Sequence, residues 1–421
     1  MTVLAPEKFI ASVEKTLYAF LSPENQKWIK QLNALYPFTF QEIRLLCEMA
    51  RDLEMWEEKS IEVYWNELEN RLPGFSDPKQ RKDRLFGQLR ALVRAQKERP
   101  KSYTQKIPLS RKESLHIVTE ETGKKIFGDC PVASEKTVCC NLKTIDAVEN
   151  CAFGCSYCTI QTFYGDRIAF DKNFKEKLNQ IELDPNRFYH VGTGQSSDSL
   201  IWGNREGILD HLCEFARKHP NILLEFKTKS DNVSYFLDHE VPKNIVISWS
   251  LNPDVMIQNE EHFTASLDRR FKAAKKVRDR GVKVAFHFHP IVYYEGWKQA
   301  YPELAERVQT MFRPEEILFI SFGSVTLIKP VIQEIRKRGG ATKILQMEMV
   351  PDPHGKLTYP DSVKLELFQT MFDAFQGWHG KVFFYLCMER AYFWDQVFGW
   401  HYPTNEEFER DFGLKTMAKI Q

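Results

Sequence analysis

The middle of the chain alternates short apolar runs with amphipathic stretches. Six apolar runs have strand character, at residues 143–148, 187–192, 222–227, 244–250, 282–289 and 317–323. Between them, apolar residues recur at helical spacing, as in residues 209–216, 266–277 and 301–311. Six strand-then-helix units in succession favour a parallel sheet that closes into a barrel or partial barrel. The pattern therefore predicts an α/β fold with about six βα units.

Polar residues follow the predicted strands where each strand ends. These ends are residues 192–198, 227–231, 248–252, 287–290 and 321–324. Barrels of this kind carry their chemistry at the carboxyl ends of the strands, so the five ends predict a pocket above the barrel. Gly192 and Gly194 let the backbone approach a ligand closely, and we expect both to line a cofactor pocket.

Charged side chains at two of these ends have a functional and a plainer interpretation. Lys229 can neutralise a carboxylate, and strand alternation puts Lys227 on the same face. His287 and His289 share a face in the same way. The plainer interpretations are paired surface lysines and histidines that are hydrogen-bonded in the core.

The flanks of the predicted barrel differ from it in pattern. Residues 1–100 show helical periodicity and predict a helical accessory domain. Residues 101–140 predict a basic linker and lead-in, and residues 141–340 the barrel. Residues 341–421 form an aromatic-rich α/β extension, whose rings suit either base stacking or plain packing.

A basic stretch runs from Lys79 to Lys112. It contains only two acidic residues, Asp83 and Glu98, but twelve basic ones: Lys79, Arg81, Lys82, Arg84, Arg90, Arg94, Lys97, Arg99, Lys101, Lys106, Arg111 and Lys112. The stretch suits a phosphate-binding surface. It equally suits a solvated helix face followed by a charged linker.

Composition places the chain among globular proteins of a reducing compartment. It has 421 residues, a formal net charge of +1 and nine cysteines. The cysteines are too few for a disulfide framework, and the sequence shows neither a signal-peptide pattern nor a long apolar run. We therefore predict a soluble, cytoplasmic protein without a membrane span.

Three cysteines dominate the candidate chemistry. Cys151, Cys155 and Cys158 are spaced C-x3-C-x2-C directly after the first predicted barrel strand. Three close thiolates can hold three irons of a four-iron cluster and leave the fourth open. The alternative is a closed zinc site completed by Cys139 or Cys140.

This motif, with Tyr157 before its last cysteine, resembles the signature of radical S-adenosylmethionine (SAM) enzymes. The resemblance implies that the three cysteines hold a 4Fe–4S cluster whose open iron binds SAM. It implies reductive cleavage of SAM to a 5′-deoxyadenosyl radical, with Tyr157 lying against the adenine.

Within that group, residues 140 to 330 are similar to spore photoproduct lyase and its relatives. The similarity rests on residues 194–199, 226–229, 249–252, 270–274 and 290–297. It implies a partial (βα)6 radical SAM barrel, reversal of a thymine dimer in DNA, and an electron donor such as a flavodoxin or ferredoxin. It also implies that Ser196, Lys229 and Ser250 contact SAM.

Two departures bear on the reaction. Gln195 stands where the lyase has its cysteine hydrogen donor, and Thr159 stands where it has a tyrosine. Glutamine has no weak bond to hydrogen, so another donor is needed. Cys387, with Tyr385 beside it, is our candidate, and Cys139 and Cys140 are alternatives; a buried core thiol is the plainer interpretation of Cys387.

Three functional hypotheses follow from these observations. The first is a radical SAM enzyme that acts on a nucleic acid. The second is a radical SAM modification of another substrate, favoured by Gln195. The third is a non-catalytic iron–sulfur or zinc protein that binds DNA.

Overall fold

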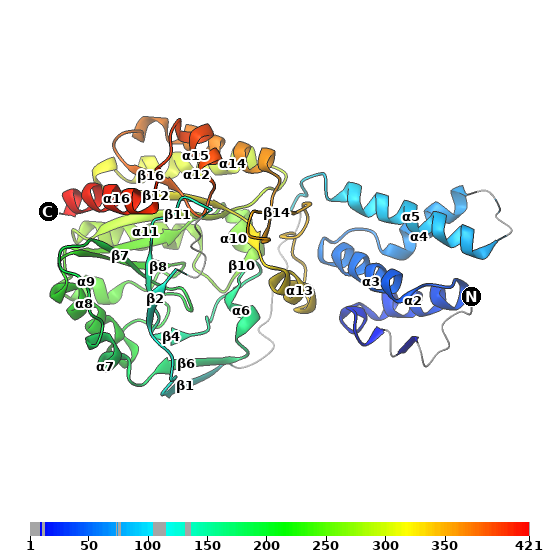
Figure 1. The fold of residues 1–421 in the computed structure, drawn as a ribbon, viewed down its shortest axis with the longest axis horizontal. Helices are drawn as coiled ribbons and strands as arrows, with labels where there is room; N and C mark the ends of the chain where they lie inside the picture. Colours follow the sequence, from blue (N-terminus) through cyan, green and yellow to red (C-terminus); the bar gives the residue numbers. More distant parts are fainter. Residues whose placement is uncertain are drawn as a thin grey trace. The chain divides into compact units, whose positions relative to one another are not determined.

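The chain forms two compact units. A computed structural model describes residues 9–10, 13–72, 74, 77–103, 115–130 and 136–420. One unit comprises Met1–Leu109 with Leu327–Val350, and the other Ser110–Thr326 with Pro351–Gln421 (Figure 1). This division differs from the predicted boundaries, which put residues 327–340 in the barrel. Of the basic stretch, Lys106, Arg111 and Lys112 lie outside the described residues.

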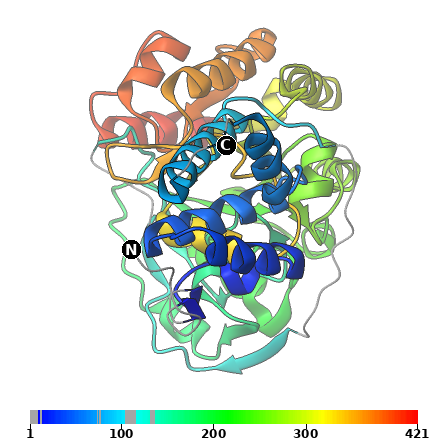
Figure 2. The same cartoon turned by 90° about the vertical axis from the view of Figure 1, so that its right-hand side faces the viewer.

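The first unit is helical (Figure 2). Its elements are η1 (Tyr18–Phe20), α2 (Pro23–Leu35), α3 (Phe40–Met55), α4 (Ile61–Arg71), α5 (Pro78–Gln96) and α13 (Lys329–Lys337). Helix α13 contacts α3, and its apolar residues Val331, Ile332 and Ile335 are buried. An amphipathic helix packs where its apolar face can be buried, which explains why this segment belongs to the helical unit and not to the barrel.

Side chains at the helix starts explain where the helices of this unit begin. The hydroxyl of Ser22 accepts a hydrogen bond from the backbone N–H of Asn25. Thr39 and Glu42 form a reciprocal capping box at α3. Such caps satisfy backbone N–H groups that have no partner inside the helix, and each stabilises the helix by about 1 kcal/mol.

The second unit is built on an eight-stranded sheet with the order β16-β12-β11-β9-β8-β7-β3-β2. Its strands are β2 (Phe127–Asp129), β3 (Lys143–Ile145), β7 (Tyr189–Thr193), β8 (Ile222–Thr228), β9 (Ile245–Ser250), β11 (Lys283–Ile291), β12 (Ile317–Ser324) and β16 (Phe383–Leu386). All neighbours pair in parallel except β2 with β3. The six predicted strands and the partial barrel are confirmed, and β16 adds a seventh parallel strand.

Helices and short strands surround this sheet (Figure 1). The helices are α6 (Ile160–Phe163), α7 (Phe174–Asn179), α8 (Ile208–Lys218), α9 (Ser234–Asp238), α10 (Asp254–Glu260), α11 (Leu267–Asp279), α12 (Trp297–Met311), α14 (Asp361–Ala374), α15 (Ala391–Phe398) and α16 (Asn405–Ile420), with η2 (Arg205–Gly207), η3 (Pro314–Glu316) and η4 (Gln376–Trp378). The short strands are β1 (His116–Glu120), β4 (Val148–Glu149), β5 (Gly154–Cys155), β6 (Arg167–Asp171), β10 (Glu261–His262), β13 (Thr326–Leu327), β14 (Val350–Pro351) and β15 (Leu357–Thr358). No described helix combines the length and apolarity needed to cross a membrane.

Helix α16 packs against the sheet and carries part of the aromatic core. It contacts β7, β8, β12 and β16. The ring of Phe412 lies 4.7 Å from that of His190 and 5.3 Å from that of Phe319. Large rings bury much apolar area and favour such edge and tilted contacts.

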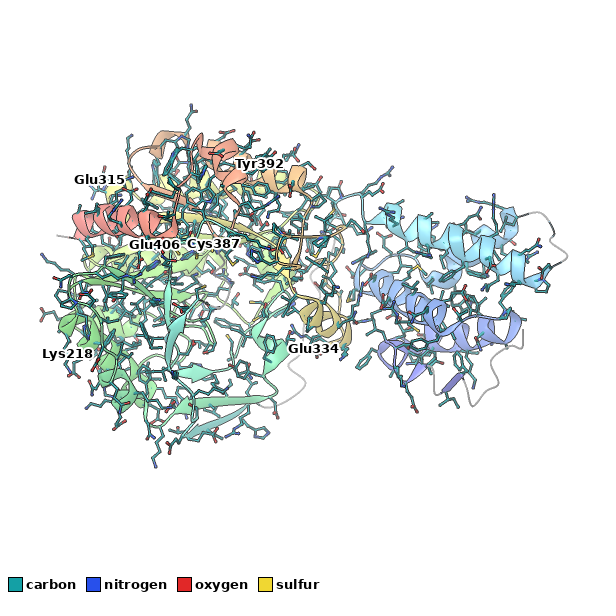
Figure 3. The ribbon with its side chains drawn as sticks, viewed as in Figure 1. Lys218, Glu315, Glu334, Cys387, Tyr392 and Glu406 are labelled. Carbon is teal, nitrogen blue, oxygen red and sulfur yellow. The ribbon has the colours of Figure 1, made fainter. Side chains whose placement is uncertain are left out.

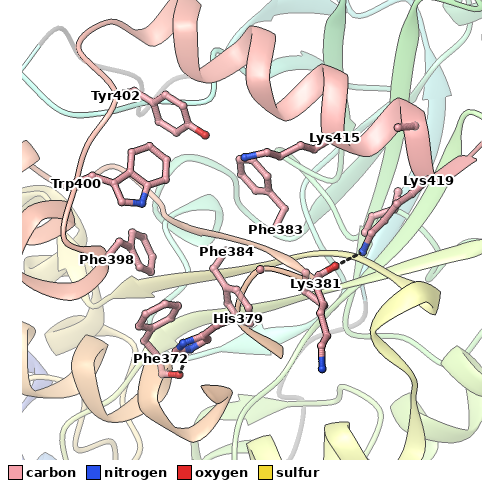
Figure 4. Close-up of a pocket in the computed structure, with 14 residues that line it drawn as sticks. Phe372, His379, Lys381, Phe383, Phe384, Phe398, Trp400, Tyr402, Lys415 and Lys419 are labelled. Atoms are coloured by element: carbon pink, nitrogen blue, oxygen red, sulfur yellow. Dashed lines mark hydrogen bonds between the residues drawn. The ribbon is translucent and has the colours of Figure 1, made fainter. Parts of the chain in front are cut away.

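Other aromatic residues of the extension line a pocket at the amino ends of β12 and β16 (Figure 4). Phe398, Trp400 and Tyr402 lie on one side of it, across from Lys415. The carboxyl ends of the same parallel strands face the other way. These rings therefore do not cover the barrel mouth.

Candidate active site

The cysteine loop is held by pairing to a distant segment. Strand β5 pairs antiparallel with β10, so that Cys155 faces Glu261. The backbone N–H of Ser156 donates to the carbonyl of Glu260 over 2.9 Å. A Cβ at Gly154 would come within 3.2 Å of the Phe263 ring, so a larger residue at this crossing would require that ring to shift.

The loop and the strand ends enclose one cavity of about 130 Å³. Seven residues predicted from the sequence line it: Cys151, Cys155, Tyr157, Cys158, Gly194, Lys229 and Ser250. Phe153, Ile160, Ser197, Asp198, Lys227 and Thr228 complete the lining. The structure thus brings the three thiols and most of the predicted SAM contacts to the same place.

The three thiols suit a cluster better than a single ion. Among the described residues, no three Cys, His, Asp or Glu side chains converge to hold one metal ion. A cluster has no such requirement, because each thiolate binds a different iron. Cys139 and Cys140, which a zinc site would have needed, are not among the described residues that line this cavity. Burial raises the pKa of the Cys151 thiol to about 12, so an iron bound here would have to displace its proton.

Gly194 makes the tight turn at the end of β7. Its φ of +87° lies in the left-handed region. A Cβ there would lie 2.6 Å from Ser199 Oγ and 2.9 Å from the Lys227 carbonyl oxygen. No other residue type fits without displacing the backbone. The glycine therefore allows β7 and β8 to approach each other at the cavity wall.

Asp198 organises the wall that carries Lys229. Its carboxylate accepts hydrogen bonds from the Lys229 backbone N–H at 2.7 Å and from Thr228 Oγ1 at 2.8 Å. It also accepts from the N–H groups of Leu200 and Ile201, both at 3.0 Å. Burial raises the pKa of this carboxyl, while these donors lower it. Sequence reasoning gave Asp198 no role, although it lay in a segment quoted for the family resemblance.

A buried ion pair anchors Tyr157. The Tyr157 hydroxyl donates to Glu261 Oε1 over 2.5 Å, and Asn252 Nδ2 donates to the same atom over 2.8 Å. Arg270 Nη2 lies 2.6 Å from Glu261 Oε2, and both side chains are fully buried. Although burial opposes ionisation, Arg270 and Lys229 hold the pKa of Glu261 at about 2. Sequence reasoning missed Glu261, because it lies in an ordinary charged segment.

Two predicted SAM contacts lie away from the cavity. The Ser196 hydroxyl is 2.7 Å from Asp146 Oδ1 and 2.6 Å from the Val148 carbonyl, and it lines a neighbouring pocket. Gly192 lies within β7, where an added Cβ would meet the Leu142 side chain at 3.1 Å. The structure therefore does not bring Ser196 and Gly192 to the cavity, whereas Ser197 lines it.

The histidines of β11 belong to a hydrogen-bonded network inside the barrel. Glu225 lies 2.5 Å from His287 Nε2 and 2.8 Å from His190 Nε2. Ser321 Oγ lies 2.5 Å from His287 Nδ1 and 3.0 Å from His289 Nε2. Burial, reinforced by Lys227, lowers the pKa of His287 to about 4. His287 is therefore a buried, hydrogen-bonded core residue, and His289 is a half-buried residue hydrogen-bonded to the same network.

Cys387 directly follows β16 (Figure 3), and other thiols lie near it. Its backbone N–H donates to the Phe322 carbonyl at 2.8 Å. Burial raises the pKa of its thiol, Lys227 lowers it, and Cys130 and Cys139 raise it further. Cys139 also raises the pKa of Cys140. The three donors considered from the sequence are thus neighbours, and they do not line the cavity of the cysteine loop.

Tyr385 points into the same region of the barrel. It is 2 % exposed, and its pKa is raised by burial and by Cys140, Glu225 and Cys387. The ring lies 5.8 Å from Phe319. Tyr385 is therefore near enough to both Cys387 and Glu225 for their charges to raise its pKa.

Comparison with known proteins identifies the family. The family model described as spore photoproduct lyase matches residues 142–352, half of the 421-residue chain. This chain belongs to the spore photoproduct lyase family. The match covers the barrel strands β3 to β12 and helix α13, but it starts after helices α2 to α5 and ends before β16.

Curated relatives and solved structures agree with this assignment. Spore photoproduct lyases of Clostridium acetobutylicum and Bacillus subtilis are 27% and 29% identical, over 41% and 46% of this chain. The chain spans 53% and 59% of those relatives' lengths. A solved spore photoproduct lyase complexed with dinucleoside spore photoproduct has a TM-score of 0.55 and 22% identity, covering 64% of this chain and 82% of that one. This likeness confirms the fold.

Proposed function

We propose that this protein is a radical SAM enzyme of the spore photoproduct lyase type. The observation that carries the proposal is the cavity shared by Cys151, Cys155 and Cys158 with Tyr157 and Lys229. These thiols would hold a 4Fe–4S cluster, which when bound supplies the electron that cleaves SAM to a 5′-deoxyadenosyl radical.

The chain's own residues would bind and orient SAM. The Lys229 ammonium lies 5.8 Å from the centre of the Tyr157 ring, so one wall offers a positive charge beside an aromatic face. A carboxylate and an adenine are the groups of SAM that suit these partners. Asp198 fixes the Lys229 backbone, and Glu261 fixes the Tyr157 hydroxyl. Gly194 keeps the backbone close at the same wall, beside Ser250.

The proposed substrate is DNA that carries a thymine photoproduct. A related lyase was solved with a dinucleoside spore photoproduct, at a TM-score of 0.55 to this chain. The 5′-deoxyadenosyl radical would take a hydrogen atom from the lesion, after which the bond between the bases breaks. A flavodoxin or ferredoxin is the proposed electron donor.

Cys387 is the proposed hydrogen donor, with Tyr385 as its neighbour. The substrate radical would take the hydrogen atom of the thiol, which forms a C–H bond and leaves a thiyl radical on sulfur. Gln195 cannot do this, because its N–H and C–H bonds are too strong. Burial raises the pKa of the Cys387 thiol, and the S–H form that donates hydrogen is therefore retained at neutral pH.

Gln195 also supports a second candidate, a radical SAM reaction on a different substrate. A reaction that ends in oxidation or rearrangement of the substrate needs no thiol donor. Products made from UV-irradiated DNA and from undamaged nucleic acid would separate the two candidates. A non-catalytic cluster protein that binds DNA would give no 5′-deoxyadenosine with either.

The decisive test is SAM cleavage without oxygen. After reconstitution with iron and sulfide and reduction, the protein should convert SAM to 5′-deoxyadenosine. Cys151→Ala, Cys155→Ala and Cys158→Ala should each abolish this product. Cys213→Ala, which removes a buried thiol of α8, is the matched control and should retain it. Product from any of the three cluster variants would refute the assignment.

The hydrogen donor is tested by its products. Cys387→Ala should still cleave SAM but divert the substrate radical to side products instead of repaired thymines. Adding Gln195→Cys to this variant should restore repair if a thiol is what is missing. Unchanged products from Cys387→Ala would discard Cys387 as the donor.

A further inference from the structure

Seven of the basic residues in and around α5 fall into two groups. The first group is bound in ion pairs within the helical unit. Arg81 lies 3.1 Å from Glu69, Lys82 2.7 Å from Glu42, Lys97 3.3 Å from Asp52, and Lys101 2.6 Å from Glu58. These four cations neutralise carboxylates of α3, α4 and the segment between them, and they are already paired.

The second group comprises Arg84, Arg90 and Arg94. All three are exposed, and none of their side chains forms an ion pair or hydrogen bond within the described part of the chain. Three unpaired guanidinium groups on one short helix repel one another, which costs stability at low salt. Their side chains are therefore free to bind an anion.

Small residues separate these arginines on the outward side of α5. The buried stripe of the helix comprises Lys82, Leu85, Phe86, Leu89 and Val93. Gly87 and Ala91 are exposed and lie on the other side. A Cβ at Gly87 would meet nothing within 4 Å. A bulky, negatively charged polymer can therefore approach the helix backbone between the arginines.

A groove of about 520 Å³ runs along this side of the helix, between α5 and α3. Gly87, Arg90, Ala91 and Arg94 line it from α5. Of its acidic residues, Glu48 is paired with Arg44, and Asp52 with Arg336 and Lys97. Glu348 is the remaining carboxylate, and it has no ion pair within the described residues. The net charge offered to a ligand is positive.

We propose that Arg84, Arg90 and Arg94 bind the sugar-phosphate backbone of duplex DNA. Guanidinium groups match phosphate oxygens in charge and geometry. Arg84 and Arg94 are ten residues apart, about 15 Å along a helix. That length covers about four phosphates of one DNA strand. The inference rests on the proposed function only in that it takes a nucleic acid as the ligand. It gives the helical unit a role in the affinity for DNA.

A pair of substitutions at Gly87 tests this surface. Gly87→Glu and Gly87→Gln have nearly the same size, their Cβ meets no atom within 4 Å, and both replace a helix-interior glycine by a better helix former. They differ only in charge. We expect Gly87→Glu to weaken binding of a duplex DNA by about tenfold at low salt, and Gly87→Gln to change it less than about twofold. Equal affinities for the two variants would overturn the proposal.

Salt dependence gives a second, quantitative readout on the full-length protein. Replacing all three arginines by glutamine should reduce the slope of log K against log salt by about 2.7, or about 0.9 for each phosphate contact. Lys59→Gln, which removes an exposed charge that is already paired with Glu67, should leave the slope unchanged. An unaltered slope in the triple variant, or no binding of duplex DNA by the unmodified protein, refutes the surface.

This test separates the inference from the proposed reaction. SAM cleavage should be the same in both Gly87 variants, because the cluster cavity lies in the other unit. If the unmodified protein repairs no thymine photoproduct but Gly87→Glu still weakens DNA binding, the DNA-binding surface is supported and the proposed substrate is refuted. If repair occurs and the two variants bind DNA with equal affinity, the DNA-binding surface is refuted and the proposed reaction is supported.

Discussion

At the scale of single residues, the pairing of Glu261 with Arg270 decides how the cysteine loop is held. Removing one partner of a buried ion pair leaves the other charge uncompensated in a medium that solvates it poorly. Arg270 also donates to the carbonyls of Ala265 and Ser250, so its charge cannot move to water. The pair therefore couples Tyr157 to the end of β9.

Glu261→Gln should destabilise the protein by about 3 kcal/mol or more, because Arg270 keeps its charge without a counterion. Thermal or denaturant unfolding measures the loss. Glu214→Gln is the control, since Glu214 pairs with Lys218 on the surface with both side chains about half exposed; its effect should be much smaller, because solvent screens an exposed pair. Equal effects for the two variants would contradict the importance of the buried pair.

At the scale of elements, α16 shows how tertiary packing overrides helix propensity. Gly413 lies inside this helix, where alanine is normally favoured by about 1 kcal/mol. A Cβ at this position would lie 2.6 Å from the Phe188 ring. The glycine is therefore explained by the close approach of α16 to the start of β7.

Gly413→Ala should lower the free energy of unfolding by about 1–2 kcal/mol, because the cost of overpacking exceeds the gain in helix propensity. Gly87→Ala in α5, whose Cβ meets nothing within 4 Å, should raise it by up to about 1 kcal/mol. Urea unfolding of both variants gives the sign of each change in the free energy of unfolding. A stabilised Gly413→Ala variant would show that Phe188 moves aside at little cost.

At the scale of the whole molecule, the network inside the barrel makes stability depend on pH. The folded state holds the pKa of His287 at about 4, and that of His289 well below its usual value. The unfolded chain, with ordinary histidine pKa values near 6.5, binds more protons between these limits. Stability is therefore lost as the pH falls from about 6.5 towards 4. The lowered pKa of Glu225 extends the loss to still lower pH.

We expect the loss from His287 to be on the order of 3 kcal/mol between pH 7 and pH 4. Urea midpoints followed by circular dichroism at several pH values measure it. His287→Asn should flatten the dependence, because asparagine keeps polar atoms but does not titrate in this range. An identical pH profile in this variant would assign the effect to other groups.

Several features of this protein follow from sequence alone, because their signals are local. The six βα units are visible in the periodicity, and all six strands lie where the pattern places them. The spacing of Cys151, Cys155 and Cys158 matches the signature of the family, and the structure brings all three to one cavity. Gly194 and Lys229 follow from their places at strand ends, and both line the cavity.

Other features depend on contacts between distant segments, which no local pattern encodes. Helix α13 joins the helical unit because its apolar face meets α3, and Ser196 turns to Asp146 instead of the cavity. Glu261 reaches Tyr157 only because β10 pairs with β5. Cys387, Cys139 and Cys140 meet because residues 138 and 389 form a bridge between remote parts of the chain. Sequence sets which residues can do the chemistry, and only tertiary packing decides which of them share a site, because that depends on which buried faces pair.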